Sequence, residues 1–219
     1  MNIIGICGHA GSGKDTAADF LVAKGYQKIS LADPLKRICA DVFRFSREQL
    51  WGPSENRNRQ DMRYPYRYDK ALGLTPRYAL QRLGTEWGRD CYDDIWIEYA
   101  IRMARAVLEG EAPGGGFWYY RPEMGLWGDG KAPKSDCPAG VVIPDVRFAN
   151  EVAAIQQAGG RVIRLLRPRS DGAVRGGIPG HASEAEQDRL PAELFHATIH
   201  NTGTLEDLKR DVLEVVRLP

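Results

Sequence analysis

The chain has 219 residues, of which 43% are hydrophobic and 27% are charged. These values are ordinary for a folded globular protein, and the length suffices for one α/β domain with a buried sheet but not for two full domains. The formal net charge of +1 argues against a protein that mainly binds duplex nucleic acid or an anionic membrane.

The spacing of the cysteines and the length of the apolar runs help to predict the cellular compartment of the protein. The chain has 4 cysteines without paired spacing, at positions 7, 39, 91 and 137. This pattern favours reduced thiols over a disulfide framework or a zinc site. No basic segment with a long apolar run precedes the first strand, and no apolar stretch is long enough to span a bilayer. We therefore expect a cytoplasmic protein without a membrane partner.

The first motif lies at the start of the chain. An apolar run over residues 3–7 leads into the glycine-rich sequence Gly8-His9-Ala10-Gly11-Ser12-Gly13-Lys14-Asp15-Thr16. A strand, a glycine-rich turn and a helix form a phosphate-binding loop, because glycines let backbone N–H groups point at phosphate oxygens and the helix adds its positive dipole end. Nucleotide binding is therefore expected, with Lys14 reaching the β and γ phosphates. The alternative is an ordinary glycine turn.

One position departs from the usual loop. The residue after the lysine is normally Ser or Thr and binds magnesium, whereas here it is Asp15 and the hydroxyl follows as Thr16. A carboxylate is a hard oxygen ligand, directly or through water. Asp15 and Thr16 are both candidate magnesium ligands, and the change disfavours generic NTPase families.

The next elements are a helix over residues 16–25, a short strand over 26–30 and a second helix to about residue 43. Ala17, Phe20 and Leu21 share one face of the first helix, and Pro34 suits the first turn of the second. Ligands of open α/β sheets bind at the carboxyl ends of strands, which makes Asp33 and Lys36 candidate substrate-binding residues. The alternative is a helix cap and a solvated lysine.

Residues 52–74 show no helical or strand pattern and interleave arginines with tyrosines. Such residues can grip phosphates and stack on a base, or form a polar, mobile excursion on the surface. We leave both interpretations open for this segment.

A helix is expected to begin at Thr75 and Pro76. One face carries apolar residues that we expect in the core: Ala79, Leu80, Leu83, Trp87 and Cys91. A neighbouring face carries Arg77, Gln81, Gly84, Thr85 and Gly88. Since the two glycines leave room beside Arg77 and Gln81, this face is predicted to be a ligand wall. Arg82, Glu86 and Arg89 are expected to form a solvated salt-bridge cluster.

A further helix is predicted over residues 94–109, with core positions at Ile97, Ala100, Ile101, Ala104, Val107 and Leu108. Residues 110–140 are rich in Gly, Pro and aromatic side chains. Such a connection is either an elaboration with a small hairpin or a flexible flap. The sequence does not decide between the two.

A buried strand begins at Val141 and ends near Asp145. An acid at the carboxyl end of an apolar strand is the second half of a phosphate-binding-loop site, where Asp145 holds magnesium through water or accepts a proton. Arg147 is placed to neutralise a transferring phosphate. The alternative is that Asp145 only caps the helix that begins near Asn150.

The remaining elements complete the predicted sheet. Strands are expected over residues 161–166 and 197–200, followed by a turn at 201–203 and a capped closing helix. Between the strands, residues 167–182 form a predicted basic lid with Arg167, Arg169 and Arg175.

The ordered set of motifs resembles phage-type deoxynucleoside monophosphate kinases. It comprises the glycine-rich loop, Leu31-Ala32-Asp33-Pro34-Leu35-Lys36, Arg77 with Leu83-Gly84-Thr85-Glu86, Pro144-Asp145-Val146-Arg147 with Asn150-Glu151, Leu166-Arg167-Pro168, His181-Ala182-Ser183-Glu184 and Asn201-Thr202-Gly203. The match follows the chain in order and leaves out residues 52–74 and 110–140. No single piece beyond the loop is specific, but the ordered set is.

The resemblance implies an α/β P-loop kinase fold over residues 1–219, with a parallel sheet of about five strands flanked by helices and an inserted lid. It implies that the γ-phosphoryl group of ATP, with Mg²⁺, passes to the 5′-phosphate of a deoxynucleoside monophosphate for DNA precursor synthesis. The cytosol of a bacterial or phage-infected cell is the implied location. The segment 110–140 is a candidate surface for a homodimer.

The resemblance also implies roles for single residues. Residues 8–16 would bind ATP, and Asn201 to Gly203 would lie along the adenine. Lys36, Arg77 and Arg147 would contact the acceptor phosphate and the transition state. Gln81 as a reader of the acceptor base is inferred from its helix face alone. Gly11 stands where some relatives carry an arginine, so that one phosphate contact is missing or comes from the lid.

Three alternatives stay open. Another small-molecule kinase of this fold, such as a dephospho-coenzyme A or phosphomevalonate kinase, would differ in its acceptor wall. A regulatory GTPase or mechanical ATPase is disfavoured, because the chain lacks an Asn-Lys-x-Asp motif and Val146 stands where many ATPases place a glutamate. A nucleotide-binding protein without catalysis would be indicated by loss of Lys14 or Arg147, and both are present.

Overall fold

The computed structural model describes residues 2–109, 119–121, 125–127, 138–168, 187 and 189–217. They group into two compact units, Met1–Ser30 with Ile97–Pro219 (unit 1) and Leu31–Trp96 (unit 2). Each unit is described by itself. The expectation of one kinase domain over residues 1–219 stays a prediction.

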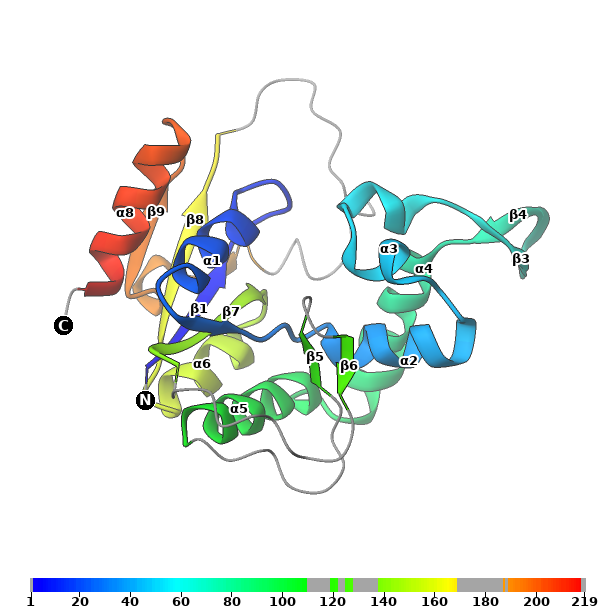
Figure 1. Ribbon diagram of the computed structural model, residues 1–219, viewed down its shortest axis with the longest axis horizontal. Coiled ribbons are helices and arrows are strands. Elements are labelled where there is room, and N and C mark those ends of the chain that lie inside the picture. The colour runs from blue at the N-terminus through cyan, green and yellow to red at the C-terminus, as the bar shows by residue number, and fades with distance from the viewer. Residues whose placement is uncertain are drawn as a thin grey trace. The chain divides into compact units, whose positions relative to one another are not determined.

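Unit 1 is built on a five-stranded parallel sheet with the order β2-β7-β1-β8-β9 (Figure 1). Its strands are β1 (Ile3–Cys7), β2 (Tyr26–Lys28), β7 (Gly140–Val146), β8 (Arg161–Leu166) and β9 (Ala197–His200). All residues of β1 are buried, as expected for a central strand covered on both faces. The predicted α/β class with a parallel sheet of about five strands flanked by helices is confirmed.

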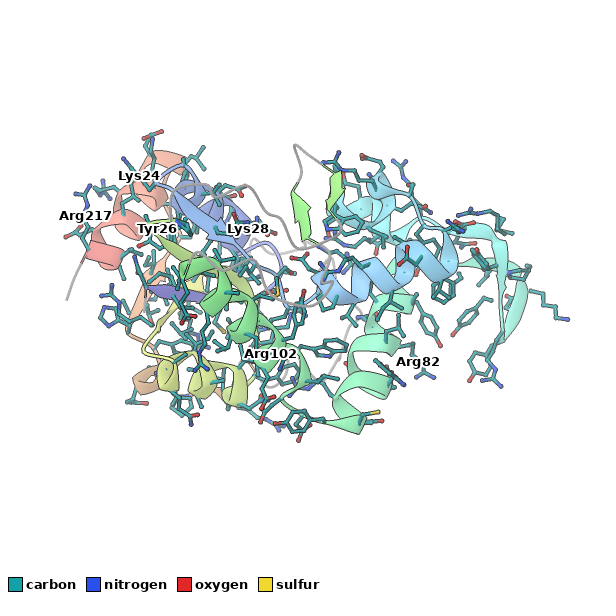
Figure 2. The ribbon with its side chains drawn as sticks, turned by 60° about the horizontal axis from the view of Figure 1, so that its bottom comes forward. Lys24, Tyr26, Lys28, Arg82, Arg102 and Arg217 are labelled. Carbon is teal, nitrogen blue, oxygen red and sulfur yellow. The ribbon has the colours of Figure 1, made fainter. Side chains whose placement is uncertain are left out.

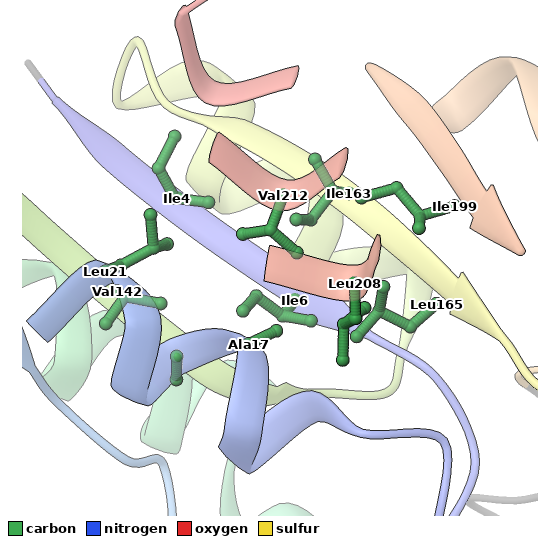
Figure 3. Packing of buried hydrophobic residues seen from close by; sticks show 11 residues of the cluster. Ile4, Ile6, Ala17, Leu21, Val142, Ile163, Leu165, Ile199, Leu208 and Val212 are labelled. Carbon is green, nitrogen blue, oxygen red and sulfur yellow. The ribbon is translucent and has the colours of Figure 1, made fainter. Parts of the chain in front are cut away.

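Helices cover both faces of this sheet. Figure 3 shows the face under α1 (Lys14–Val22) and α8 (Leu205–Arg217), where apolar side chains of the strands pack against both helices. This cluster includes Ile4, Ile6, Ile163 and Leu165 from the sheet and Ala17, Leu21, Leu208 and Val212 from the helices. On the opposite face, Ile155 of α6 (Ala149–Gln157) packs so closely that a Cβ on Gly5 would lie 2.8 Å from its Cδ1 atom.

The helix predicted over residues 94–109 is α5 (Ile95–Leu108), with Ile97, Ala100 and Ala104 in the core. Val107 and Leu108 are only half-buried at its end. Within residues 110–140, β5 (Tyr119–Arg121) pairs with β6 (Gly125–Trp127) in antiparallel fashion, which supports the small-hairpin interpretation. None of the helices in the described part of the chain has the length and apolar character needed to cross a bilayer.

Unit 2 begins with α2 (Asp33–Phe43) and α3 (Arg47–Trp51), and its core gathers Cys39, Phe45, Leu50 and Ala79. Residues 52–74 are regular, although their sequence shows no helical or strand pattern. They form a 3₁₀ turn, η1 (Ser54–Asn58), and an antiparallel hairpin of β3 (Asp61–Tyr66) and β4 (Asp69–Leu74). The tyrosines at 64, 66 and 68 do have the strand period of two. Because the hairpin is mostly exposed, however, its sequence lacks the regular alternation of apolar and polar residues by which a strand is recognised.

The helix that begins after Thr75 has two parts. Thr75 caps α4 (Pro76–Gln81) by accepting the Tyr78 N–H at 3.2 Å, as predicted. The chain then continues as a π-helix, η2 (Arg82–Arg89), whose i→i+5 hydrogen bonds break the 3.6-residue period. The prediction that Trp87 and Cys91 lie in the core is therefore wrong, because Trp87 is 52% exposed and Cys91 is exposed.

Candidate active site

The loop between β1 and α1 has the backbone shape that its glycines predict. Gly8, Gly11 and Gly13 have φ values of 155°, 79° and 101°. A Cβ on Gly8 would lie 2.5 Å from the carbonyl oxygen of Leu165 and 2.7 Å from the Ser12 hydroxyl oxygen, so the first position requires glycine. A Cβ on Gly11 would meet nothing within 4 Å in the described structure, so the loop faces open space there.

Two polar side chains of the loop, those of Ser12 and Lys14, are placed so that they can bind an anion. Ser12 is only 3% exposed, and its hydroxyl oxygen is buried without a hydrogen-bond partner among the described residues. Lys14 opens α1, and its Nζ donates to the carbonyl oxygen of His9 at 2.7 Å. A buried polar atom without a partner is costly, and a phosphate oxygen would satisfy the Ser12 hydroxyl. The loop residues therefore fit the phosphates of a nucleotide.

The electrostatics of Lys14 link the two halves of the predicted site. Burial and, to a smaller extent, the positive charge of Arg147 together lower the pKa of Lys14 from 10.5 to about 8, against the smaller opposite effects of Asp15, Cys7 and Asp145. The structure therefore brings Lys14, Arg147 and Asp145 into one electrostatic environment at the carboxyl ends of β1 and β7. Two cations that follow the paired strand ends Cys7 and Val146 favour a bound polyanion.

Asp145 lies at the carboxyl end of β7 and is half-buried. Its Oδ2 atom accepts a hydrogen bond from the Ser30 hydroxyl at 2.6 Å. At the start of α6, the carboxylate of Glu151 accepts the N–H groups of Arg147 at 2.6 Å and Phe148 at 3.1 Å, so Glu151 does the capping that was the alternative role of Asp145. The sequence predicted no role for Ser30 or for Glu151, although Ser30 ends a predicted strand, where ligands of such sheets bind.

The candidate magnesium ligands supply hard oxygens. Asp15 is 86% exposed and lies 3.4 Å from Nζ of Lys28, a residue of β2 labelled in Figure 2, which also lies 3.1 Å from Asp19. Thr16 is half-buried in the first turn of α1. The described residues hold no cluster of three or more His, Cys, Asp or Glu side chains for a metal. Magnesium at phosphate sites needs only one or two carboxylates beside the substrate's oxygens, so by their chemistry Asp145, Thr16 and Asp15 stay candidate ligands of this ion.

The turn after β9 packs against the glycine-rich loop. Nδ2 of Asn201 donates to the carbonyl oxygen of Ser12 at 2.9 Å, so Asn201 braces the loop backbone, which the sequence did not predict. The predicted cap of the closing helix is present, since Thr204 Oγ1 accepts the Asp207 N–H at 3.2 Å and the Asp207 carboxylate accepts the Thr204 N–H at 2.9 Å. A Cβ on Gly203 would lie 2.7 Å from this carboxylate. The role of both turn residues toward adenine stays a prediction.

Unit 2 holds the predicted acceptor residues, and several of them have partners within the unit. Nζ of Lys36 lies 3.8 Å from Asp33 Oδ1 and 5.8 Å from the ring centroid of Trp51. Arg77 donates to Asn58 and, at 2.9 Å, to the Ser54 hydroxyl, which ties α4 to η1. Gln81 differs, because its Oε1 atom is buried and has no hydrogen-bond partner in the part of the chain that the structure describes.

The predicted ligand wall around these residues is only partly correct. The indole ring of Trp96 fills the space beside Gly88, and its Nε1 donates to the carbonyl oxygen of Gly84 at 2.9 Å. Gly88 therefore makes room for the protein's own side chain and not for a ligand. The predicted surface ion pair between Arg82, labelled in Figure 2, and Glu86 is confirmed at 2.9 Å.

The predicted lid falls mostly outside the described residues. Arg167 follows β8 and is exposed, whereas Arg169 and Arg175 lie outside the described part of the chain, as do His181 and Glu184. Downstream, Arg164 of β8 donates to the carbonyl oxygens of Gln187 at 3.1 Å and Leu190 at 3.2 Å.

Comparison with known proteins identifies the family. A protein of Acanthamoeba polyphaga mimivirus, named provisionally as a deoxynucleotide monophosphate kinase, is 32% identical over 219 residues, which cover 99% of this chain and 96% of the relative. No protein-family model matches the chain.

Solved structures are less similar. A sugar kinase of Janibacter is 12% identical with a TM-score of 0.48, over 99% of this chain and 94% of that one. A dephospho-CoA kinase of Campylobacter jejuni is 13% identical with a TM-score of 0.46, over 99% and 96%. The assignment therefore rests on the viral relative and agrees with the loop geometry. This chain is a kinase and belongs to the deoxynucleotide monophosphate kinase family.

Proposed function

We propose that this kinase transfers the γ-phosphoryl group of ATP to the 5′-phosphate of a deoxynucleoside monophosphate, giving the diphosphate for DNA precursor synthesis. The observation that carries the proposal is the pairing of Lys14 and Arg147 in one environment at the mouth of the glycine-rich loop, where the charge of Arg147 contributes to the lowered pKa of Lys14. Such a cation pair suits a phosphoryl group that gains charge density on its oxygens during transfer.

On the donor side, the proposed ATP contacts are Gly8, Gly11, Ser12, Gly13, Lys14, Asp15 and Thr16. The backbone N–H groups of the loop and the Ser12 hydroxyl hold phosphate oxygens, and Lys14 exchanges the His9 carbonyl oxygen for the β and γ phosphates. Asn201 holds the loop in shape through its contact with Ser12, and with Gly203 it is the proposed neighbour of the adenine. Bound Mg²⁺ would neutralise phosphate charge, with Asp145, Thr16 and Asp15 as its candidate protein ligands.

On the acceptor side, Lys36, Arg77 and Arg147 are the proposed phosphate contacts, and Asp33 is a further substrate-binding candidate. Gln81 is the proposed reader of the base. Its buried Oε1 atom lacks a partner, and an N–H donor of a base edge would satisfy it. A guanidinium held by its own unit, as Arg77 is by Ser54, is pre-organised for a phosphate.

The chemistry asks the protein for alignment and charge neutralisation. A nucleoside monophosphate is already a nucleophile near neutral pH, so a strong general base is unnecessary and Asp145 acts in positioning. Hydrolysis of ATP is the competing loss, and a lid over Arg167, Arg169 and Arg175 would exclude water during transfer. Magnesium use, the cytoplasmic location and a homodimer stay predictions.

The test is ADP formation from magnesium-ATP with a panel of acceptors. The panel contains the four common deoxynucleoside monophosphates, the matching ribonucleotides, dephospho-coenzyme A and phosphomevalonate. We expect turnover with one or more deoxynucleotides and none without an acceptor. Turnover confined to dephospho-coenzyme A or phosphomevalonate would contradict the proposal and favour another small-molecule kinase.

A further inference from the structure

The carboxyl ends of β2 and β7 place a hydroxyl group beside the acid of the site. The two strands run parallel, with Lys28 opposite Val142, and the Ile29 N–H continues the pairing by donating to the carbonyl oxygen of Val142 at 2.9 Å. Ser30 is the next residue, and its hydroxyl lies 2.6 Å from Oδ2 of Asp145. The contact joins residues that are 115 positions apart in the sequence.

This hydrogen bond has the length of a strong one. A hydroxyl that donates to a carboxylate at about 2.5–2.7 Å makes a charge-assisted bond roughly twice as strong as a neutral one. Both residues are half-buried, so water competes less well for the carboxylate than it does at an exposed position. Oδ2 is engaged, which fixes the carboxylate rotamer and with it the direction of Oδ1.

The bond is not needed to hold the two strands together. Backbone pairing between β2 and β7 already extends from Tyr26 and Gly140 to Ile29 and Val142, and the Ser30 hydroxyl lies beyond it. The apolar cluster under α1 includes Val142 of β7 but not Ser30. The hydroxyl therefore has little part in the packing of the sheet, and it donates to Asp145, an acid whose charge acts on Lys14.

We propose that Ser30 is a positioning residue for catalysis, which holds the Asp145 carboxylate in the rotamer used with the magnesium nucleotide. The inference rests on the proposed function for the role of Asp145, but not for the contact itself. Groups that orient a metal-binding side chain typically change metal affinity or activity about 10- to 100-fold when they are removed. Ser30→Ala is therefore expected to lower kcat about 10-fold, while KM for ATP and for the deoxynucleotide changes less than about twofold.

The experiment compares four proteins: wild type, Ser30→Ala, Ser30→Thr and Ser46→Ala. Ser46→Ala is the matched control, because it also removes a hydrogen-bonded serine hydroxyl, which in this case accepts the Gln49 N–H at 3.2 Å at the start of α3. We expect this control to lose thermal stability and keep its kcat. Ser30→Thr keeps the donor and is expected to recover most of the wild-type kcat.

A second readout does not depend on turnover. Binding of Mn²⁺ to the complex with ADP, followed by electron paramagnetic resonance, is expected to weaken about 10-fold in Ser30→Ala, with metal-free ADP binding unchanged. Should Ser30→Ala fail to fold, Ser30→Cys keeps the volume and replaces a strong donor by a weak one, and the same two measurements decide.

The outcomes separate this inference from the proposed function. A kcat and Mn²⁺ affinity of Ser30→Ala within twofold of wild type would overturn the positioning role, even if the wild type phosphorylates deoxynucleotides. A kcat of Ser30→Cys that, per folded protein, stays within twofold of wild type would overturn it where Ser30→Ala does not fold. If the wild type uses no deoxynucleotide, the proposed function fails, and the Mn²⁺ measurement alone decides the role of Ser30.

Discussion

The two units differ in how their polar residues are satisfied. In unit 1, the glycine-rich loop keeps a buried Ser12 hydroxyl without a partner, and Lys14 rests on a carbonyl oxygen of its own loop. In unit 2, the charged candidates are tied to their own scaffold, as Arg77 is to Ser54 and Arg63 is to Asp61 at 2.6 Å. A polar atom buried without a partner among the described residues is a candidate for ligand binding, whereas one bonded within its own unit also supports the fold.

This contrast orders the candidates. The residues of unit 1 are expected to affect the chemical step directly. Those of unit 2 are expected to divide, with Gln81 on the side of ligand binding because its Oε1 atom has no partner, and Asp61 and Arg63 on the side of stability. Substitutions at these positions should therefore have effects that decrease from Lys14 to Asp61.

Lys14→Ala is expected to lower kcat by on the order of 10³-fold or more, because the γ-phosphoryl group loses a buried positive charge. The measurement is steady-state ADP formation, with the circular dichroism spectrum as a test of folding. Lys24→Ala removes an exposed lysine just after α1 and serves as the control. Near-normal turnover in a folded Lys14→Ala protein would remove this residue from the mechanism.

Arg147→Ala is expected to lower kcat by roughly 10²- to 10³-fold, since its guanidinium shares the environment of Lys14. The same substitution should raise the pKa of Lys14 by removing a neighbouring positive charge. The control is Arg102→Ala, which removes an exposed arginine of α5 that lies 3.8 Å from Glu98. An unchanged kcat for Arg147→Ala would mean that Lys14 neutralises the charge of the transferred phosphoryl group without Arg147.

Nucleotide binding is expected to weaken as the pH rises through about 8, the lowered pKa of Lys14. The sign follows from burial and Arg147, which lower this pKa, so that Lys14 loses its charge at a lower pH than an ordinary lysine and must take up a proton to hold phosphate. The dissociation constant of ADP should rise by about tenfold for each pH unit above this value. Calorimetry between pH 7 and pH 9 measures it, and a flat profile would contradict a protonated Lys14 as the phosphate contact.

Gln81→Ala is expected to raise KM for the preferred deoxynucleotide about 5- to 10-fold and to leave KM for ATP unchanged, because one hydrogen bond to the base is lost. The free energy of unfolding should not fall by the amount usual for a lost hydrogen bond, because Oε1 has no partner to lose. Gln156→Ala is the control, since its Nε2 donates to the Leu194 carbonyl oxygen at 2.8 Å. Equal changes in both KM values would show that Gln81 supports the fold and does not bind the base.

Asp61→Asn is expected to leave kinetics unchanged and to lower the free energy of unfolding by about 1–2 kcal/mol. Hydrogen bonds from Arg63 hold the pKa of Asp61 well below its usual range, so its stabilising effect is present above the ordinary carboxyl pKa and is lost as the pH falls below it. Urea unfolding at pH 7 and pH 3 measures this, and the difference between variant and wild type should shrink at pH 3. A large change in KM for the deoxynucleotide would instead place this hairpin in substrate binding.

The sequence predicts unit 1 well because its signals are local. The glycine spacing defines the loop, an apolar run defines β7, and Thr204 with Asp207 defines the start of α8. Each depends on residues within a few positions of one another. The residues singled out at the strand ends, Lys14, Asp145 and Arg147, lie in one environment because parallel strands end at one edge.

The features that the sequence did not predict depend on distant partners. Trp87 leaves the core because η2 has i→i+5 bonding, and Trp96, eight positions after Gly88, fills the space beside that glycine. The β3–β4 hairpin is exposed and polar, so no apolar face marks it in the sequence. The bond between Ser30 and Asp145 joins two strands that become neighbours only in the folded sheet.

Phosphoryl transfer to a deoxynucleotide is tested most directly by following the label from γ-³²P ATP in the presence of each deoxynucleoside monophosphate. Wild type and Lys14→Ala are measured side by side. We expect the label in a deoxynucleoside diphosphate with the wild-type protein and on the order of 10³-fold less with the variant. Label released only as inorganic phosphate, or recovered in no nucleotide, would contradict the proposal that this kinase phosphorylates a deoxynucleoside monophosphate.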